Sequence, residues 1–321
     1  MSPRAFFALA AGVALFTGVL VWQGVGSVLA AFAGAGWGLV LVAAFHLVPL
    51  VLDTAGLGVL IERSSGFGVV MRARWVGESV NGLLPVAQMG GEVAKLRVLT
   101  RAGISGSDAA AAVIASVTLA AAAQIVFALI GIGLLAGRVG AGVLAVLMAG
   151  IAGLAALVLL FYRIQQRGLF SWFARTGREW FDLSGGAWAL DRALHSVYGR
   201  RRAALASFAL HLIGWIAGLG EVWLALYFLG HPVSWTEALL LESLGQAVRG
   251  MAFAIPGALG VQEGGYLFLG ALVGLPADTA LALSLAKRGR ELLLGIPGLI
   301  YWQVSEGRML RRRGRAAQVV D

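Results

Sequence analysis

The sequence predicts an all-α, polytopic membrane protein with about six transmembrane helices and two re-entrant helical hairpins in an inverted-topology repeat. The 321 residues are 59% hydrophobic and 13% charged, with a mean hydropathy of +0.85. A soluble domain carries about 25% charged residues, so the composition excludes an ordinary soluble enzyme. The chain has no cysteine, which excludes a disulfide framework and a thiolate metal site.

Uncharged runs along the chain predict the spans, because hydrocarbon about 30 Å thick needs about 20 apolar helical residues. No charged residue lies between Arg4 and Asp53. For the first span, a retained helix is favoured over a cleaved signal peptide. The expected spans are Ala5–Val21, Trp37–Leu60, Ala109–Gly137, Val139–Tyr162, Ala203–Gly220 and Leu292–Ser305, the last extending back to about Thr279.

The distribution of arginine predicts the orientation, since cytoplasmic loops are enriched in Lys and Arg. Eight arginines against three acids lie in residues 163–202, and five more lie in the tail, 306–321. The connections 23–36 and 230–236 carry no Lys or Arg. We therefore expect a multi-pass protein of the bacterial inner membrane with both termini in the cytoplasm.

A single membrane domain is expected over residues 1–321. Its first half is 5–162 with a re-entrant segment at 75–101, and its second half is 203–305 with a re-entrant segment at 237–278. Between the halves, 163–202 is expected to be a cytoplasmic amphipathic loop whose apolar residues, Leu169, Phe170, Phe173, Trp180 and Phe181, lie on an anionic leaflet. A nucleic-acid site is disfavoured, because no folded basic module is present.

The first broken segment, Trp75–Arg101, has arginines before it and at its end, so both ends are expected in the cytoplasm. Pro85 and the pair Gly90-Gly91 interrupt it, which favours two half-helices around an irregular turn. The second, Glu237–Asp278, is interrupted at Pro256-Gly257 and is expected to begin and end outside.

The two broken segments also resemble each other in sequence. Glu78-Ser79-Val80-Asn81 is similar to Glu242-Ser243-Leu244-Gly245, and each string leads to a proline, a glycine-containing turn and a Glu beside paired glycines. Opposite entry sides together with this similarity predict an inverted repeat with a site between its halves. The alternative is two ordinary helical hairpins that cross the membrane fully.

Helical spacing places the polar residues of these segments on common faces. Half-helices beginning near Gly91 or Gly260 would direct free N–H groups towards an anionic group such as a lipid phosphate. Lys287 and Glu291 are expected to pair on the last helix. The residues expected to line the path of a headgroup are Glu78, Asn81, Pro85, Gln88, Gly91, Glu92, Lys95, Arg97, Glu242, Gln246, Arg249, Pro256, Gly257, Gly260, Glu263, Lys287, Arg288 and Glu291.

Signatures of catalysis and of an energy source are missing from the sequence. It contains no phosphate-binding loop, no H-E-x-x-H zinc motif and no G-x-S-x-G nucleophile motif. No enzymatic activity, cofactor or metal is therefore expected. His211 is expected to pack through a hydrogen bond, and Asp53 is either an intramembrane acid or an interfacial one.

The motifs Asn81-Gly82-Leu83-Leu84-Pro85 with Gly91-Glu92, and Pro256-Gly257-Ala258-Leu259-Gly260-Val261-Gln262-Glu263, resemble the flippase-like membrane domain of lysylphosphatidylglycerol synthases and its stand-alone relatives. Lys287-Arg288 also fits. The string from Glu78 to Gln88 looks most like the subgroup associated with hopanoid biosynthesis in bacteria. The chain ends at Asp321, so the aminoacyl-transferase activity of the synthases is not expected to carry over.

The resemblance implies a protein that moves a lipid, or a lipid-linked molecule, between leaflets. Membrane lipids are the expected partners, with membrane proteins of the hopanoid pathway as further candidates. Two alternatives stay open. One is an accessory protein of hopanoid biosynthesis that transports nothing, and the other is a membrane-embedded lipid transferase that uses Glu78 or Glu242 as a base.

Overall fold

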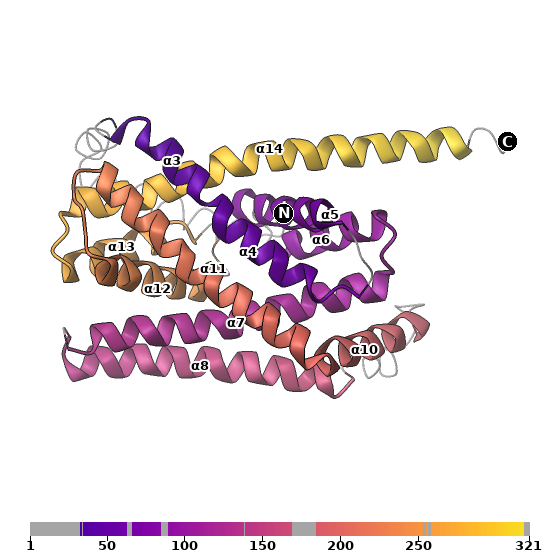
Figure 1. Cartoon of the computed structure of the whole chain (residues 1–321), viewed down its shortest axis with the longest axis horizontal. Coiled ribbons are helices and arrows are strands. Elements are labelled where there is room, and N and C mark those ends of the chain that lie inside the picture. Colours follow the sequence, from indigo (N-terminus) through magenta and orange to yellow (C-terminus); the bar gives the residue numbers. More distant parts are fainter. Residues whose placement is uncertain are drawn as a thin grey trace.

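The computed structural model describes residues 33, 35–62, 66–84, 89–137, 139–168, 184–252, 255 and 258–317. For 184–185 and 306–317 it describes the backbone alone. These parts of the chain form helices and short connections (Figure 1). The helices are α3 (Gly38–Phe45), α4 (Leu47–Gly58), α5 (Phe67–Leu83), α6 (Gly90–Arg101), α7 (Gly106–Leu135), α8 (Ala141–Gln166), α10 (Ser184–Gly199), α11 (Arg201–Phe228), α12 (Trp235–Met251), α13 (Val261–Leu272) and α14 (Ala277–Ala317).

Four helical stretches of the described chain are long and apolar enough to cross a membrane. They are Gly38–Gly58, which contains α3 and α4, and the helices α7, α8 and α11. They confirm four of the predicted spans, with boundaries that differ by a few residues. The predicted first span, Ala5–Val21, lies outside the described residues.

The predicted last span, 279–305, lies within α14, a continuous helix of 41 residues. Its length and its charged residues set it apart from the four apolar stretches. Pro297 lies inside α14. Because proline has no N–H, the carbonyl of Leu293 receives no bond from this position of the helix.

The first apolar stretch is interrupted at His46, which ends α3 and precedes α4. Pro49 accounts for the interruption, because it cannot donate to the carbonyl of Phe45 four residues earlier. The carbonyl of His46 does accept the N–H of Leu50, at 3.1 Å. This break places the imidazole of His46 in the interior of the helix bundle.

Each predicted broken segment forms a pair of short helices. The first pair begins at Phe67, eight residues before the predicted start, and the second extends from Trp235 to Leu272. In both pairs the first helix has 17 residues and the second has 12. In Figure 1, α12 and α13 lie in the left-hand half of the molecule, and α5 and α6 lie in the right-hand half.

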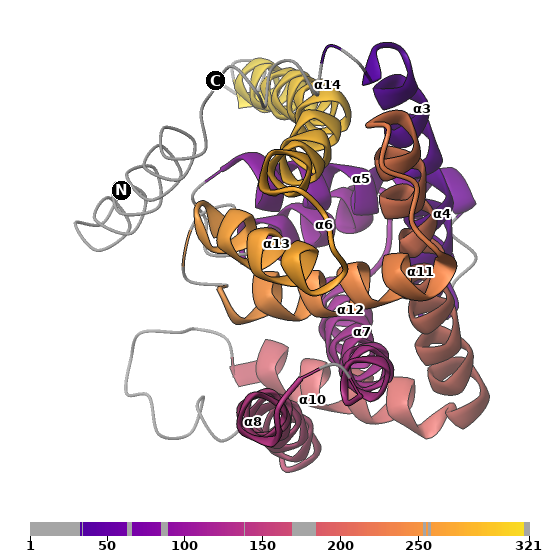
Figure 2. The same cartoon turned by 90° about the vertical axis from the view of Figure 1, so that its left-hand side faces the viewer.

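The described helices pack around two large apolar clusters that share α7 and a smaller one between α5, α6 and α14. One large cluster joins α7 to α11, α12, α13 and α14, and the other large cluster joins α7 to α4, α5, α6 and α10. Figure 2 shows α7 and α8 at one side of the bundle and α14 at the other. In the most apolar 18-residue stretch of α8, only 6% is buried inside the protein, as expected of a helix that faces lipid.

Helix α10 packs against the protein at the end of the bundle where α11 begins. Its Leu194 and Val197 are buried against α7 and its neighbours. The hydroxyl of Tyr198 donates to Gln165 Oε1 at 2.8 Å, and the Gln165 amide donates to Thr118 at 3.0 Å. The predicted amphipathic helix around Leu169 lies outside the described residues.

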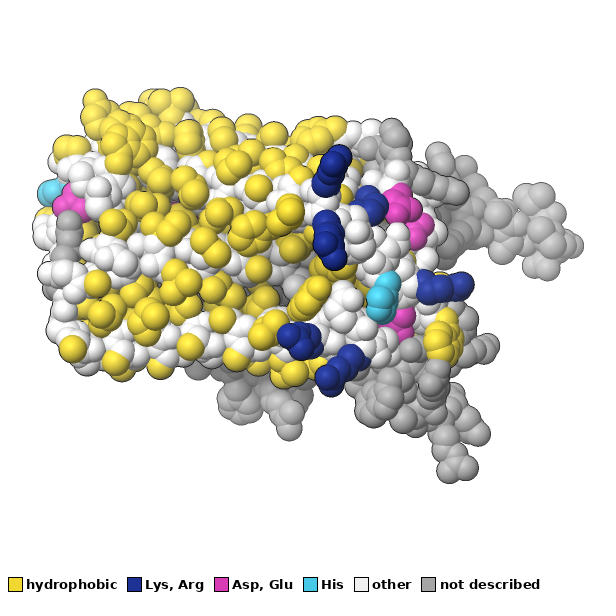
Figure 3. Space-filling view, turned by 60° about the horizontal axis from the view of Figure 1, so that its bottom comes forward, with side chains coloured by type: hydrophobic (Ala, Val, Ile, Leu, Met, Phe, Trp, Pro, Cys, Tyr) yellow, Lys and Arg dark blue, Asp and Glu magenta, His cyan; other side chains and the backbone are white. Residues whose placement is uncertain are grey.

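The surface in Figure 3 carries a broad hydrophobic band, and lysine and arginine side chains gather beyond its right-hand end. A band of this kind matches the hydrocarbon region of a bilayer, and the basic residues lie where a membrane–water interface would be.

Candidate functional site

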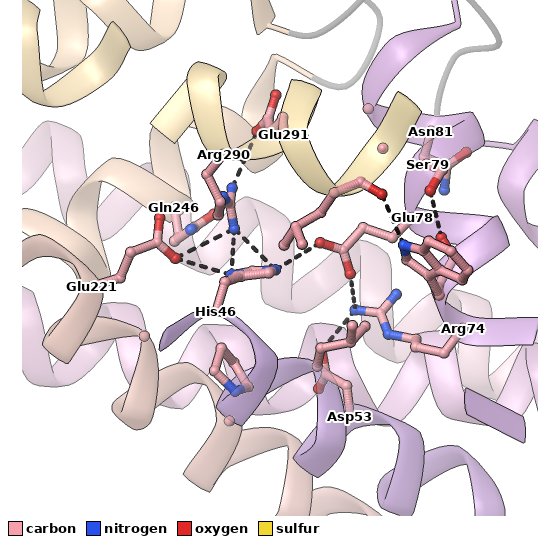
Figure 4. A pocket seen from close by; sticks show the side chains of 18 of the residues that line it. His46, Asp53, Arg74, Glu78, Ser79, Asn81, Glu221, Gln246, Arg290 and Glu291 are labelled. Atoms are coloured by element: carbon pink, nitrogen blue, oxygen red, sulfur yellow. Dashed lines mark hydrogen bonds and ion pairs between the residues drawn. The ribbon is translucent and has the colours of Figure 1, made fainter. Parts of the chain in front are cut away.

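A cavity of about 220 Å³ lies between α4, α5, α11, α12 and α14 (Figure 4). Its lining is rich in charged groups. The residues that line it are His46, Pro49, Leu50, Asp53, Arg74, Trp75, Glu78, Ser79, Asn81, Gly82, Gly214, Trp215, Gly218, Glu221, Glu242, Gln246, Arg249, Arg290, Glu291, Leu294 and Gly295.

The cavity lies near the middle of two spans. His46 to Asp53 occupy the centre of the stretch Gly38–Gly58, and Gly214 to Glu221 lie halfway along and just beyond the middle of α11. Ionised side chains at this depth cost about 2.5–3.5 kcal/mol each on insertion scales. Their partners therefore have to come from the protein or from water in the cavity.

His46 is in contact with three charged residues from three helices (Figure 4). Its Nε2 lies 2.7 Å from Glu78 Oε1 on α5, and its Nδ1 lies 2.9 Å from Glu221 Oε2 on α11. The guanidinium of Arg290, on α14, contacts both ring nitrogens and lies 3.0 Å from Nε2.

Arg290 continues the network along α14. Its Nη1 donates to Glu221 at 3.3 Å, and its Nη2 donates to Glu291 at 3.4 Å. Glu291 in turn forms an ion pair with Arg249 of α12. Arg249 also donates to Gln262 Oε1 at 3.2 Å. Its guanidinium therefore links α12 to both α13 and α14.

A second branch of the network centres on Lys287, of which 2% of the side chain is exposed. Its Nζ lies 2.6 Å from Glu242 Oε2 and 3.6 Å from Glu221 Oε1. The amide of Gln246 donates to the other oxygen of Glu242 at 2.8 Å. Both carboxylate oxygens of this buried acid therefore have partners.

A third branch begins at Asp53 of α4. Arg74 Nη2 lies 2.6 Å from Asp53 Oδ2 and 3.8 Å from Glu78 Oε2. The other oxygen of Asp53 lies 2.7 Å from His211 Nδ1, and His211 Nε2 lies 3.0 Å from the hydroxyl of Ser116. Asp53 is thus an intramembrane acid with two partners, and His211 has the hydrogen-bonded packing role predicted for it.

Two glycines of α11 make room for the acids of the cavity. A Cβ at Gly214 would lie 3.3 Å from Asp53 Oδ1, and a Cβ at Gly218 would lie 3.2 Å from Glu242 Oε1. Both distances are shorter than usual Cβ contacts. The small residues therefore let carboxylates from α4 and α12 approach the same helix.

Six of the predicted site residues line the cavity. Lys287 borders it through Glu242. The six are Glu78, Asn81, Glu242, Gln246, Arg249 and Glu291. Pro85, Gln88, Pro256 and Gly257 lie outside the described residues.

The remaining predicted site residues in the described part of the chain are not among those that line this cavity. Glu92 pairs with Lys95 at 2.6 Å on α6, the helix that also carries Arg97. Arg288 pairs with Glu263 at 2.7 Å between α13 and α14.

The beginnings of the two second helices use their N–H groups internally. The N–H of Gly91 donates to Asn81 Oδ1 at 2.7 Å, and the N–H of Gly260 donates to Glu263 Oε2 at 2.6 Å. A Cβ at Gly91 would lie 2.2 Å from the carbonyl oxygen of Gly77, so α5 and α6 touch through their backbones here. These two N–H groups are therefore bound by side chains of the protein rather than turned towards an anion.

The predicted pair between Lys287 and Glu291 is wrong. Lys287 pairs with Glu242 and Glu221, and Glu291 pairs with Arg249 and Arg290. Side chains four residues apart on a helix gain only about 0.5 kcal/mol from pairing. Charged partners on α11 and α12 are buried, so water screens their attraction less, and Lys287 and Glu291 pair with these partners instead of with each other.

The predicted site set lacks five charged residues of the network, namely His46, Asp53, Arg74, Glu221 and Arg290. A signal was present in the sequence for four of them. Asp53 and Arg290 lie within predicted spans. His46 interrupts an uncharged run, and Glu221 directly follows another. An ionisable residue within a span is a functional candidate by default. Within the described residues, no group of three or more His, Asp or Glu side chains is placed to hold a metal ion.

The fold and the site together define a polytopic α-helical membrane protein with a charged cavity inside its helix bundle. Residues 9–298 match the family described as the lysylphosphatidylglycerol synthase TM region, and the chain belongs to this family, a flippase-like membrane domain associated with lipid modification. No curated protein and no solved structure matches the chain.

Proposed function

We propose that this protein moves a lipid with a charged or polar headgroup between the leaflets of the bacterial inner membrane. The observation that carries the proposal is the cavity of about 220 Å³ at the middle of two spans, lined by charged groups from five helices. A headgroup crossing hydrocarbon needs such a place, because an unsolvated charge at that depth is costly. The acyl chains would remain in lipid outside the bundle.

The network is suited to exchanging partners with a headgroup. It contains five carboxylates, Asp53, Glu78, Glu221, Glu242 and Glu291, and four cationic side chains, Arg74, Arg249, Lys287 and Arg290. A phosphate can replace a carboxylate beside Arg249, and an ammonium can replace a guanidinium beside Glu291. Exchange of this kind keeps each buried charge paired throughout the movement.

The helix lengths support re-entrant hairpins rather than full crossings. A helix of 12 residues, such as α6 or α13, is about 18 Å long. Hydrocarbon is about 30 Å thick, so neither helix reaches across it. We infer that α5 and α6 enter from the cytoplasmic side and that α12 and α13 enter from the opposite side.

The packing of the helices supports an inverted repeat. When α4, α5, α6 and α7 are exchanged with α11, α12, α13 and α14, several of the observed contacts map onto one another: α5–α14 onto α12–α7, α4–α5 onto α11–α12, and α6–α7 onto α13–α14. Equivalent small-residue contacts accompany them. Cβ atoms at Gly298 and Gly131 would each lie 2.0 Å from a serine hydroxyl, of Ser79 and Ser243 respectively. These two serines occupy the same place in the repeated sequence strings.

The orientation belongs to the same proposal. Both termini are placed in the cytoplasm, on the side of the basic residues in 163–202 and 306–321. Membrane lipids are the proposed partners, without nucleic acid, cofactor or catalytic step. The proposed connection to hopanoid biosynthesis rests on the resemblance of the string from Glu78 to Gln88. An accessory role beside membrane proteins of that pathway is the alternative to transport.

The first prediction concerns Arg249, which lines the cavity. Purified protein in vesicles of phosphatidylcholine and phosphatidylglycerol should accelerate the exchange of fluorescent phosphatidylglycerol between leaflets, measured by quenching of the outer leaflet. Arg249→Ala removes one of the two cationic partners of Glu291 and a cation of the cavity wall, so the exchange rate should fall about tenfold or more, as expected for a loss of at least about 1.4 kcal/mol. Arg249→Lys keeps the charge and should retain part of the rate.

Arg201→Ala is the matched control, because Arg201 is exposed at the beginning of α11. It should leave the rate unchanged. Exchange that is equally fast in wild type, Arg249→Ala and protein-free vesicles would refute lipid movement and leave the accessory role. A chemically altered lipid, detected by mass spectrometry of the same vesicles, would instead identify a transferase.

A further inference from the structure

The ring of His46 lies against more partners than one protonation state can satisfy. A neutral imidazole has one N–H donor and one acceptor nitrogen, and an imidazolium has two donors and no acceptor. Glu78 and Glu221 are carboxylates 2.7 and 2.9 Å from the two nitrogens, and they accept hydrogen bonds when ionised. Arg290 has donors only, and it contacts the same two nitrogens.

The three contacts therefore divide into two exclusive sets. With a proton on each nitrogen, His46 donates to both Glu78 and Glu221, and Arg290 keeps its bonds to Glu221 and Glu291. With a single proton, the ring donates to one acid and accepts from Arg290, and the other acid loses its bond to the ring. A proton on His46 thus decides how α5, α11 and α14 are linked across the cavity.

His211 provides a contrast within the same interface between α4 and α11. Its Nδ1 lies 2.7 Å from Asp53, and its Nε2 lies 3.0 Å from the Ser116 hydroxyl, which donates or accepts. A neutral ring satisfies both partners, with its N–H directed at Asp53. The partners of His211 are therefore all satisfied by a neutral ring. The partners of His46 are satisfied only in part by either protonation state.

The charge balance of the network also favours the binding of a proton to His46. Five carboxylates face four Lys or Arg side chains, which leaves one negative charge that a proton on His46 neutralises. The ionisable groups around His46 are Asp53 on its own stretch, Arg74 and Glu78 on α5, His211 and Glu221 on α11, Glu242 and Arg249 on α12, and Lys287, Arg290 and Glu291 on α14.

The helix is interrupted at His46. The residue lies in the break between α3 and α4, where Pro49 removes a hydrogen bond of the helix. Next to it, Phe45 packs closely on Gly220 of α11, because a Cβ there would lie 2.5 Å from the aromatic ring. The ring of His46 therefore lies where two helix segments meet and pack against α11.

We propose that His46 is a reversible proton-binding site that couples lipid movement to a proton gradient by switching the cavity between these two sets of contacts. The inference rests on the proposed function, and it adds the coupling ion. The imidazole takes up one proton from one side of the membrane and releases it to the other, and no other covalent bond is made or broken.

The proton site can be tested without any transport. The chain has four histidines, so protein with ¹⁵N-labelled histidine in nanodiscs gives a simple spectrum, in which His46→Gln assigns the signal of His46. We expect this signal to change from imidazolium to neutral imidazole between pH 5 and 9. A His46 signal that stays in one form over this range would overturn the proposal, even if lipid moves.

Coupling is tested in vesicles of phosphatidylcholine and phosphatidylglycerol with fluorescent phosphatidylglycerol, a pH gradient of one unit, and potassium with valinomycin to clamp the potential. If one proton moves with each lipid, a gradient of one pH unit can hold the concentrations of the labelled lipid in the two leaflets at a ratio of up to about tenfold. Wild type and the control His231→Gln, whose side chain is exposed in the connection before α12, should reach an unequal distribution. His46→Gln should give equal leaflets.

The outcomes of the two experiments are separable. Lipid that moves in wild type but stays equally distributed under the gradient would overturn the coupling and leave the proposed function intact. Absence of lipid movement in wild type would refute the proposed function, and with it the coupling. Glu221→Gln is a second variant for the case that His46→Gln does not fold, because it leaves one acceptor acid and should also abolish the unequal distribution.

Discussion

At the scale of single residues, the protein keeps many ionised side chains inside its helix bundle by giving each of them several partners. Lys287 and Glu242 illustrate this, since 2% and 3% of their side chains are exposed and their charged atoms lie 2.6 Å apart. Removing one member of such a pair leaves an uncompensated buried charge, whereas removing both leaves none. The stability of the site therefore depends on complete pairs.

The corresponding prediction concerns the free energy of unfolding. Lys287→Met should lower it by about 3–5 kcal/mol, because Glu242 then keeps only Gln246 as a partner. The double variant Lys287→Met with Glu242→Gln should be clearly more stable than the single variant. Denaturant unfolding in detergent micelles measures both, and a double variant that loses the sum of the two single effects would contradict the pairing.

At the scale of elements, close approach between helices depends on glycine at two equivalent contacts. Gly131 of α7 faces Ser243 of α12, and Gly298 of α14 faces Ser79 of α5. In each contact, an added Cβ would lie 2.0 Å from the hydroxyl and 2.9 Å from the serine Cβ. The helices would have to separate to admit a methyl group.

We therefore expect Gly131→Ala and Gly298→Ala to destabilise the protein by about 1–3 kcal/mol each. Gly133→Ala is the matched control on α7, because no described atom lies within 4 Å of its added Cβ. Alanine also has the higher helix propensity, so this control should be neutral or stabilising by up to about 1 kcal/mol. Thermal unfolding distinguishes them, and equal midpoints in all three variants would show that neither contact is tight.

At the scale of the whole molecule, lipid movement through the cavity depends on how the two helix pairs, α5–α6 and α12–α13, are oriented in the membrane and how deeply they enter it. The chain has no native cysteine, so single-cysteine variants report on one position at a time. Gly66 and Ala102 flank the first pair, and His231 and Ala277 flank the second. All four positions lie in connections between helices or at the end of a helix.

A bulky, impermeant maleimide applied to intact cells should label His231→Cys and Ala277→Cys, but it should label Gly66→Cys and Ala102→Cys only after lysis. Met89→Cys lies at the turn of the first pair, with 69% of its side chain exposed. It should resist the reagent from outside if α5 and α6 form the proposed re-entrant pair. Labelling of Met89→Cys on intact cells would instead indicate a full crossing.

Much of the architecture was predictable because it depends on local properties of the chain. Four of the predicted spans are confirmed as apolar helices, and both broken segments form two short helices. Uncharged runs and helix-breaking residues produce these features without reference to distant residues. Helix ends were less predictable, as shown by the first pair, which begins at Phe67.

The partners inside the cavity were the least predictable part. His46 and Arg290 are separated by 244 residues, and His46 and Glu221 by 175. A single polar residue in an apolar run marks a candidate, but it does not name a partner. The predicted pairing of Lys287 with Glu291 failed because the sequence shows neighbours on one helix and hides competitors on others.

The sequence by itself determined that this is a membrane protein of apolar helices with two interrupted segments, because hydropathy and helix breaking act over a few consecutive residues. Only the tertiary structure decided that acids and bases from α4, α5, α11, α12 and α14 meet around one cavity. Charge pairing acts through space over a few ångströms. It is therefore set by which helices pack together, a property of the folded bundle rather than of any segment.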